Sequence, residues 1–203
     1  RDVFEMARPN YKHIEPRYRL AKDEDFRHYI DFVHTQIREL LTQYGPLAGI
    51  WFDPIMGYYA RPDLFPIEET YAMIRELQPQ ALIAFKQGAT GTEDFASPER
   101  EGVSLAERVR QRIGPEAALV AQRAWDANQN KHNEICDTLQ PGAWGYNKDD
   151  DGNHKGPDEV LRMLANAQEQ GSNLLLNTGP LPDGAIPPED IATLREVGRR
   201  LRV

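Results

Sequence analysis

The sequence predicts an α/β fold in which parallel βα units form half of a (β/α)8 TIM-like barrel with four strands. Short apolar runs alternate with segments of helical periodicity, as in βαβ units. Runs such as 47–52 lack apolar–polar alternation, which is typical of strands covered on both faces. Polar or aromatic residues follow several of these runs. These residues are Asp53, Lys86, Trp144 and Asn177. A barrel active site is typically built from residues at the ends of several strands.

The expected strands are short and bounded by turn residues, and the third has the weakest pattern. They cover residues 47–52, 81–86, 133–139 and 173–179. A doubly wound sheet is the competing architecture. It would carry a glycine-rich phosphate loop after its first strand, and the segment "DPIMGYYARP" is not such a loop.

Helices are expected between and after these strands, where apolar residues recur at helical spacing. Asp23 resembles an N-cap, and Gly45 with Pro46 ends the first helix. The expected helices cover 23–44, 66–77, about 104–113 with a further segment at 115–124, a stretch around 160–167 that stops at Gly171, and about 187–201. Residues 1–22 are polar and irregular, and we expect 1–203 to be a single partial catalytic domain.

The composition limits the classes of function. The net charge is −8 and no basic cluster compensates, so we expect no nucleic-acid partner. Cys136 is the only cysteine, which excludes an internal disulfide and a cysteine-based zinc site. No apolar run reaches membrane-spanning length, so we expect no membrane partner. The chain begins at Arg1 without a signal-like segment, which suggests a processed or truncated chain and leaves the compartment open.

Asp53 is the first residue beyond an apolar strand, and Trp51 should point to the same side by strand alternation. An indole beside a carboxylate suits sugar chemistry, because the ring stacks on a sugar face while the acid attacks or stabilises the anomeric carbon. Capping of the following turn explains Asp53 equally well.

A glycosidase needs a second carboxylate. The loop after the second strand offers four, and a solvated acidic loop is the alternative for each of them. The candidates are Glu93, Asp94, Glu99 and Glu101.

Three segments resemble family 29 glycoside hydrolases, the α-L-fucosidases. They are "YIDFVHTQIRELLTQYGPLAGIWFD" at 29–53, "EICDTLQPGAWGYN" at 134–147 and "GSNLLLNTGPLPDGAIP" at 171–187. The resemblance implies a barrel-based retaining exo-glycosidase that removes terminal α-L-fucosyl residues from glycans. The Asp of the family's "WFD" segment is the nucleophile and corresponds to Asp53. The family's acid/base usually lies in a "DF-x-x-PE" context, which "DFASPE" matches at Glu99.

The resemblance also implies roles for other residues. Glu134 is the competing acid/base or a contact to sugar hydroxyls. Lys86 stands where relatives often carry a sugar-contacting Arg, although an ordinary strand-end lysine is the alternative. Trp144 and Tyr146 would shape the pocket around the methyl face of the sugar, or else pack in the core. Pro54 replaces the Gly that usually follows the nucleophile.

We expect no metal and no cofactor. Asn147, Asp149, Asp151 and Asp158 lie near calcium-loop spacing, but a polar turn explains them better, and the histidines show no ligand pattern. Four strands cannot close a barrel, and nothing here matches the histidines that the family's N-terminal half supplies. We therefore expect a homo-oligomer or pairing with an N-terminal half-barrel. A non-catalytic half-barrel that binds sugar or a partner protein is the alternative function.

Overall fold

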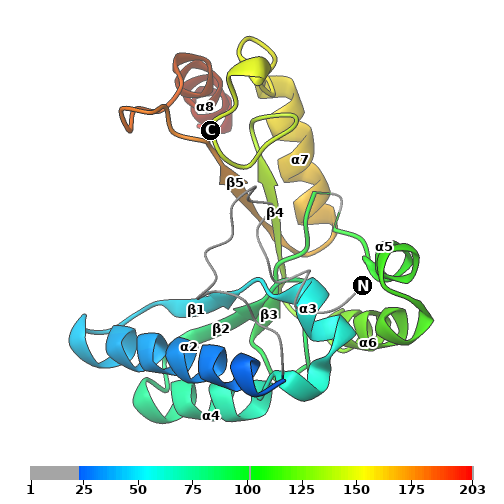
Figure 1. Cartoon of the computed structure of the whole chain (residues 1–203). Helices are drawn as coiled ribbons and strands as arrows, with labels where there is room; N and C mark the ends of the chain where they lie inside the picture. The colour runs from blue at the N-terminus through cyan, green and yellow to red at the C-terminus, as the bar shows by residue number, and fades with distance from the viewer. Residues whose placement is uncertain (1–22, 101, 203) are drawn as a thin grey trace. The chain divides into compact units, whose positions relative to one another are not determined.

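The computed structural model describes residues 23–100 and 102–202. Two compact units make up the chain, each with its own sheet (Figure 1). Unit 1 comprises Arg1–Ser97 and Ser104–Lys131, and unit 2 comprises Pro98–Val103 and His132–Val203. The expected single domain over 1–203 stays a prediction, and the expected irregular segment 1–22 lies outside the described residues.

Among the described residues, the sheet of unit 1 has three parallel strands in the order β1-β2-β3. They are β1 (Gly49–Phe52), β2 (Leu82–Phe85) and β3 (Phe95–Ala96). Gly49 pairs with Leu82 and Phe52 pairs with Phe85, so the residues that follow β1 and β2 start level with each other. The carboxyl ends of parallel strands meet at one edge of a sheet, which is where this arrangement presents Asp53 and Lys86.

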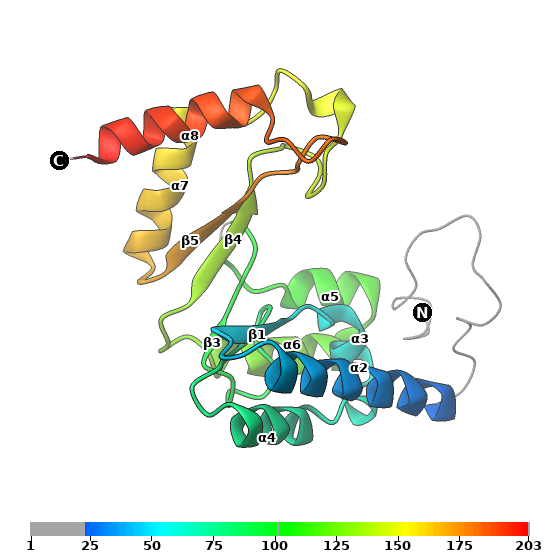
Figure 2. The ribbon, with the colours of Figure 1, turned by 90° about the vertical axis from the view of Figure 1, so that its left-hand side faces the viewer.

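In the described part of unit 1, five helices contribute apolar side chains. They are α2 (Asp23–Gln43), α3 (Ile55–Ala60), α4 (Ile67–Leu77), α5 (Ala106–Arg112) and α6 (Pro115–Asp126), with a 3-10 turn η2 (Pro62–Leu64). The helix α2 begins with three acidic residues, which interact favourably with the helix dipole. Pro115 occupies the first turn of α6, where its missing N–H costs nothing. Figure 2 shows α2 and α4 along the same side of the strands.

The core of unit 1 lies between one face of the sheet and these helices. Ile83 and Phe85 are fully buried there with Ile74 of α4. The opposite face exposes Trp51, at 40%, and Leu82, at 50%. This face is therefore apolar surface that the described residues of unit 1 leave accessible. Burying apolar surface stabilises a protein by roughly 25 cal/mol per Å².

Unit 2 has a two-stranded parallel sheet of β4 (Glu134–Thr138) and β5 (Asn173–Asn177). The helices α7 (Pro157–Glu169) and α8 (Pro188–Leu201) follow these strands, and a 3-10 turn η3 (Lys148–Asp150) lies in the loop after β4. Leu139, Val160 and Val197 form the buried core with Leu176. Leu175, on the other face of β5, is 47% exposed.

The alternation of strands and helices is confirmed, with two differences from the sequence-based prediction. The described residues form five strands in two sheets instead of four strands, because Phe95–Ala96 adds a strand too short to leave a pattern. The segment after Asp53, for which no helix was predicted, contains α3 (Ile55–Ala60). The half-barrel and its completion by a partner stay predictions. None of the described helices has the length and apolar character to cross a membrane.

Candidate active site

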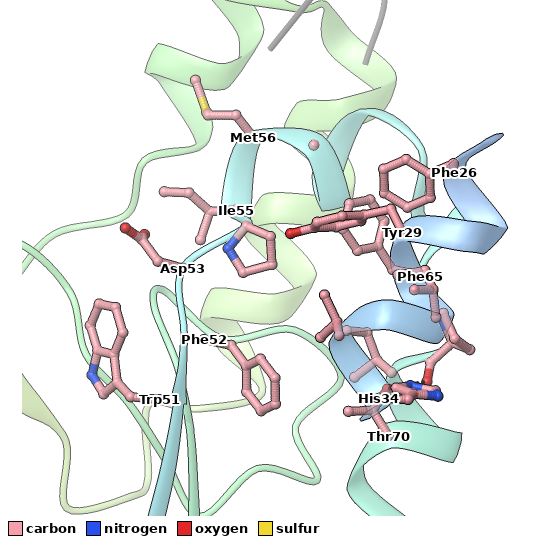
Figure 3. A pocket seen from close by; sticks show the side chains of 16 residues that line it. Phe26, Tyr29, His34, Trp51, Phe52, Asp53, Ile55, Met56, Phe65 and Thr70 are labelled. Carbon is pink, nitrogen blue, oxygen red and sulfur yellow. Dashed lines mark hydrogen bonds between the residues drawn. The ribbon is translucent and has the colours of Figure 1, made fainter. Parts of the chain in front are cut away.

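Asp53 lies directly beyond β1, and its side chain is exposed. Figure 3 shows Asp53 and Trp51 on one side of the strand and Phe52 on the other. The predicted alternation is therefore confirmed for these three residues. Phe52 packs against the core of unit 1, which fixes the strand and turns the carboxylate and the indole away from it.

Lys86 brings a cation to this carboxylate. Its Nζ lies 3.2 Å from Oδ1 of Asp53 and 5.9 Å from the centroid of the Trp51 ring. The Lys86 N–H donates to the Phe52 carbonyl at 2.9 Å, which extends the parallel pairing one residue past the strands and holds the two side chains level. Lys86 is 8% exposed, so burial restricts its position. The ammonium, carboxylate and indole form one cluster at the carboxyl ends of β1 and β2.

The loop after β2 is held by Glu93, which is 2% exposed and not solvated as the acidic-loop alternative supposed. Its carboxylate accepts hydrogen bonds from the Ala89 N–H at 2.8 Å, the Thr90 N–H at 3.2 Å and the Asn128 amide at 2.6 Å. Burial alone would raise the pKa of Glu93, but these hydrogen bonds stabilise its charged form and lower the pKa below the ordinary value. Glu93 thus fixes the loop.

Asp94 also has a structural role in this loop. It accepts a hydrogen bond from the Ile83 N–H at 2.6 Å and pairs with Arg75 at 2.8 Å. Glu101 lies outside the described residues.

Glu99 lies in unit 2, beside β4. The Cys136 N–H donates to the Pro98 carbonyl at 2.8 Å, and the Arg100 N–H donates to the Cys136 carbonyl at 2.9 Å. Glu99 therefore pairs with Cys136 in a parallel bridge, and paired residues project to the same face of a sheet. Cys136 pairs in turn with Leu175, which is exposed. Glu99 thus shares a face with Leu175, opposite the Leu176 side chain that packs in the core of unit 2, and Cys136 on the same face as Glu99 is buried.

Glu134 occupies the opposite end of β4 from Thr138. It is the first residue of the strand, and its Oε2 accepts a hydrogen bond from the Asn173 amide at 3.2 Å. Barrel active sites form at the carboxyl ends of strands, whereas Glu134 lies at an amino end. This position fits a residue that ties β4 to β5.

Trp144 and Tyr146 lie in the loop beyond the carboxyl end of β4. Asn177 holds this loop, since its amide donates to the Trp144 carbonyl at 2.7 Å and to Thr138 Oγ1 at 2.9 Å. Trp144 is 39% exposed, and the Tyr146 hydroxyl donates to Asp151 at 3.2 Å. Burial, followed by that hydrogen bond, raises the pKa of Tyr146. Neither ring belongs to the buried core of unit 2.

A cavity of about 620 Å³ opens next to β1 in unit 1 (Figure 3). Asp53 and Trp51 border it, and most of its lining is apolar side chains of α2, α3 and the start of α4. Its polar groups include His34 and Thr70, which hydrogen-bond each other at 2.8 Å. His34, on α2, is therefore part of the lining.

One group of side chains that could hold a metal ion was not predicted from the sequence. Asp151, His154 and Glu189 of unit 2 hold their ligand atoms within 4.8 Å of one another. Glu189 is far from the other two along the chain, so no spacing pattern could reveal them.

The match to a protein-family model decides the family. The model described as "Alpha-L-fucosidase" matches residues 2–203. The chain belongs to the α-L-fucosidase family. The sequence resemblance over 29–53, 134–147 and 171–187 is thereby confirmed.

Individual relatives agree with this assignment. α-L-Fucosidase 1 of Arabidopsis thaliana is 26% identical over 172 residues, which are 83% of this chain and 33% of that protein. The structure of α-L-fucosidase isoenzyme 1 from Paenibacillus thiaminolyticus is 31% identical with a TM-score of 0.63, covering 87% of this chain and 39% of that one. A family GH29 α-L-fucosidase from Bacteroides thetaiotaomicron has a TM-score of 0.61 at 21% identity, covering 98% of this chain and 44% of that one, and so supports the fold alone. The chain spans about a third of the length of the Arabidopsis relative.

Proposed function

We propose that this chain supplies the nucleophile and the acid/base of a retaining exo-α-L-fucosidase that cleaves terminal α-L-fucosyl residues from glycans. The cluster at the carboxyl end of β1 is the observation that carries the proposal. It places the Asp53 carboxylate beside Trp51 and within 3.2 Å of the Lys86 ammonium. Membership of the α-L-fucosidase family supports the substrate class.

In the proposed first step, an Asp53 oxygen attacks the anomeric carbon while Glu99 donates a proton to the departing glycosidic oxygen. In the second, Glu99 removes a proton from water, which attacks the same carbon and releases Asp53 and fucose. This chemistry requires roughly 5–5.5 Å between the two carboxyl groups. That separation stays a prediction.

The positions of the other residues support roles in binding. Lys86 orients Asp53 and faces the hydroxyls of the sugar, while Trp51 stacks on the sugar ring. Trp144 and Tyr146 lie beyond the carboxyl end of their strand, where barrel enzymes build specificity. The position of Glu134 at the amino end of β4, where the Asn173 amide holds it, makes Glu134 the weaker candidate for the acid/base.

Hydrolysis of an aryl α-L-fucoside tests the proposal. Replacement Asp53→Ala should lower kcat by roughly 10³-fold, about 4 kcal/mol in activation free energy, since no covalent intermediate can form. Asp31→Ala, on the exposed face of α2, is the matched control and should retain activity. Equal activity in both variants would exclude Asp53 as the nucleophile.

Binding without catalysis is the second candidate function. The exposed apolar faces favour it, because Trp51 and Leu82 in unit 1 offer a surface for a sugar or a partner protein. A parent protein that binds fucose but hydrolyses no aryl fucoside in its solution assembly would establish this alternative and reject the hydrolase.

We also propose that the sheet is completed by a second copy of the chain or by an N-terminal half-barrel. The edge position of β1 and the apolar cavity next to it support this proposal. If a second copy completes the sheet, light scattering should give a mass above that of a single chain. If an N-terminal half completes it, the mass should rise when that half is added. A single-chain mass under both conditions contradicts it.

A further inference from the structure

His154, in the loop between β4 and α7, is held by a buried carboxylate. Its side chain is 1% exposed, and its Nδ1 lies 2.6 Å from Oδ1 of Asp190, whose side chain is fully buried. Thr178 hydrogen-bonds the other oxygen of Asp190. With Asp190 as the acceptor, Nδ1 carries the imidazole proton. The other nitrogen, Nε2, then presents a lone pair.

That lone pair has no hydrogen-bond partner among the described residues, although Nε2 is buried. Oε1 of Glu189 lies 3.6 Å from Nε2, and the two atoms cannot hydrogen-bond each other because both are acceptors. Burying an unpaired polar atom costs about 1–3 kcal/mol, so a buried imidazole aimed at a carboxylate without bonding it requires an explanation. A bound cation between the two atoms would satisfy both.

Asp151 and Glu189 complete a set of three ligands around this nitrogen. Their oxygens and a ring nitrogen of His154 lie within 4.8 Å of one another, and Nε2 is the nitrogen at 3.6 Å from Glu189. The backbone N–H groups of Gly152 and His154 donate to Glu189 at 3.0 and 3.4 Å, and the Tyr146 hydroxyl donates to Asp151 at 3.2 Å. Each carboxylate is thus oriented by a donor and keeps further lone pairs for an ion.

We propose that Asp151, His154 and Glu189 bind one divalent transition-metal ion, with zinc as the best match. One imidazole with two carboxylates suits zinc better than calcium or magnesium, which prefer oxygen alone. The His154–Asp190 pair is the outer contact that metal-binding histidines usually have. Ligands about 2.1 Å from a tetrahedral ion lie about 3.4 Å apart, so the three must draw together by up to about 1.4 Å, a movement that exposed Asp151 can supply.

The ion would link two segments of unit 2 that are distant in sequence. Asp151 and His154 belong to the loop after β4, whereas Glu189 begins α8. A bound ion stabilises the folded chain by an amount that grows with its concentration above the dissociation constant. The site goes beyond the proposed hydrolysis and does not depend on it.

Calorimetric titration of the EDTA-treated full chain with ZnCl₂ tests this site. We expect one zinc ion per chain, and Asp151→Asn should weaken binding at least tenfold. Asp149→Asn, an exposed aspartate two residues away in the same loop, is the matched control and should bind zinc as the parent does. No binding to the parent, or equal binding to both variants, overturns the proposal.

A second measurement uses His154→Gln and distinguishes the loss of zinc binding from a failure to fold. His154→Gln should unfold at the same temperature with and without zinc, whereas zinc should raise the Tm of the parent. Co²⁺ should give a visible absorption band with the parent that disappears in His154→Gln. A zinc-dependent Tm in the variant, or tighter binding of Ca²⁺ than of zinc by the parent, contradicts the assignment.

Discussion

The contact between Lys86 and Asp53 could be predicted from the sequence only in part. Strand alternation predicts that Trp51 and Asp53 share a side, and the structure confirms it. The 3.2 Å contact with Lys86 depends on the register between β1 and β2, which no local pattern encodes. Each residue could therefore be predicted as a candidate from the sequence, but the contact between Lys86 and Asp53 could not.

Replacement of Lys86 by Met tests whether this contact serves catalysis. The partly exposed ion pair contributes about 1 kcal/mol or less to stability, so the free energy of unfolding should change little. The kcat/KM for an aryl α-L-fucoside should fall about tenfold or more. Lys86→Arg keeps the charge and should lose less. A strand-end lysine without function would give the reverse: unchanged kcat/KM and reduced stability.

For Glu93, neither catalysis nor a solvated loop, the two interpretations considered, anticipated its burial. Its partner Asn128 lies 35 residues away in sequence, so no local pattern shows the contact. Its dense hydrogen bonding to backbone N–H groups is a tertiary property. Only the run of small residues before it, Ala89 to Thr92, indicated a tight turn.

Stability should depend on pH through Glu93. Its folded pKa is lowered, so its contribution is complete above the ordinary value of 4.5 and is lost as the pH falls through the lower folded pKa. Glu93→Gln should cost about 2 kcal/mol at neutral pH and remove this part of the acid-side loss. Denaturant unfolding at several pH values measures both effects. Exposed Glu76→Gln is the control, and an identical acid-side slope in all three proteins would contradict the account.

At the scale of elements, strands and helices were predictable wherever a run was long enough to show a period. The helix α4 begins and ends within a residue of its expected bounds. The strand β3 has two residues, too few for any pattern. The helix α3 follows Pro54 and contains Gly57, both of which favour a turn, yet Tyr58 and Tyr59 bury their rings and stabilise it.

Close approach of β1 to β2 should make Gly49 intolerant of a side chain. A Cβ at this position would collide with the Leu82 carbonyl oxygen, a backbone atom that cannot move alone. Gly49→Ala should destabilise the protein by about 1–3 kcal/mol. Gly198→Ala, in α8 with no neighbouring atom within 4 Å, should instead stabilise it by about 0.5–1 kcal/mol. Thermal unfolding of both variants gives the comparison, and a stable Gly49→Ala protein would contradict this packing.

For the whole molecule, the sequence was sufficient to predict the family but not how the strands and the site residues are arranged. Motifs such as 134–147 and 171–187 are local and therefore readable, and the family match confirms them. The strand count of a barrel and the distance from Asp53 to Glu99 are non-local. Trp51 and Leu82 in unit 1 and Leu175 in unit 2 leave apolar side chains on the sheets accessible, and the expected half-barrel stays a prediction.

Covalent labelling tests the central claim, that Asp53 is the nucleophile, most directly. The Bacteroides thetaiotaomicron relative was trapped as a covalent intermediate with 2-fluoro-fucosyl fluoride. The same reagent should add one fluorofucosyl group per chain to this protein in its solution assembly. Mass spectrometry of the peptides should locate that group on Asp53, and Asp53→Ala should stay unlabelled. A label on Glu99 or Glu134, or no label at all, would contradict the account.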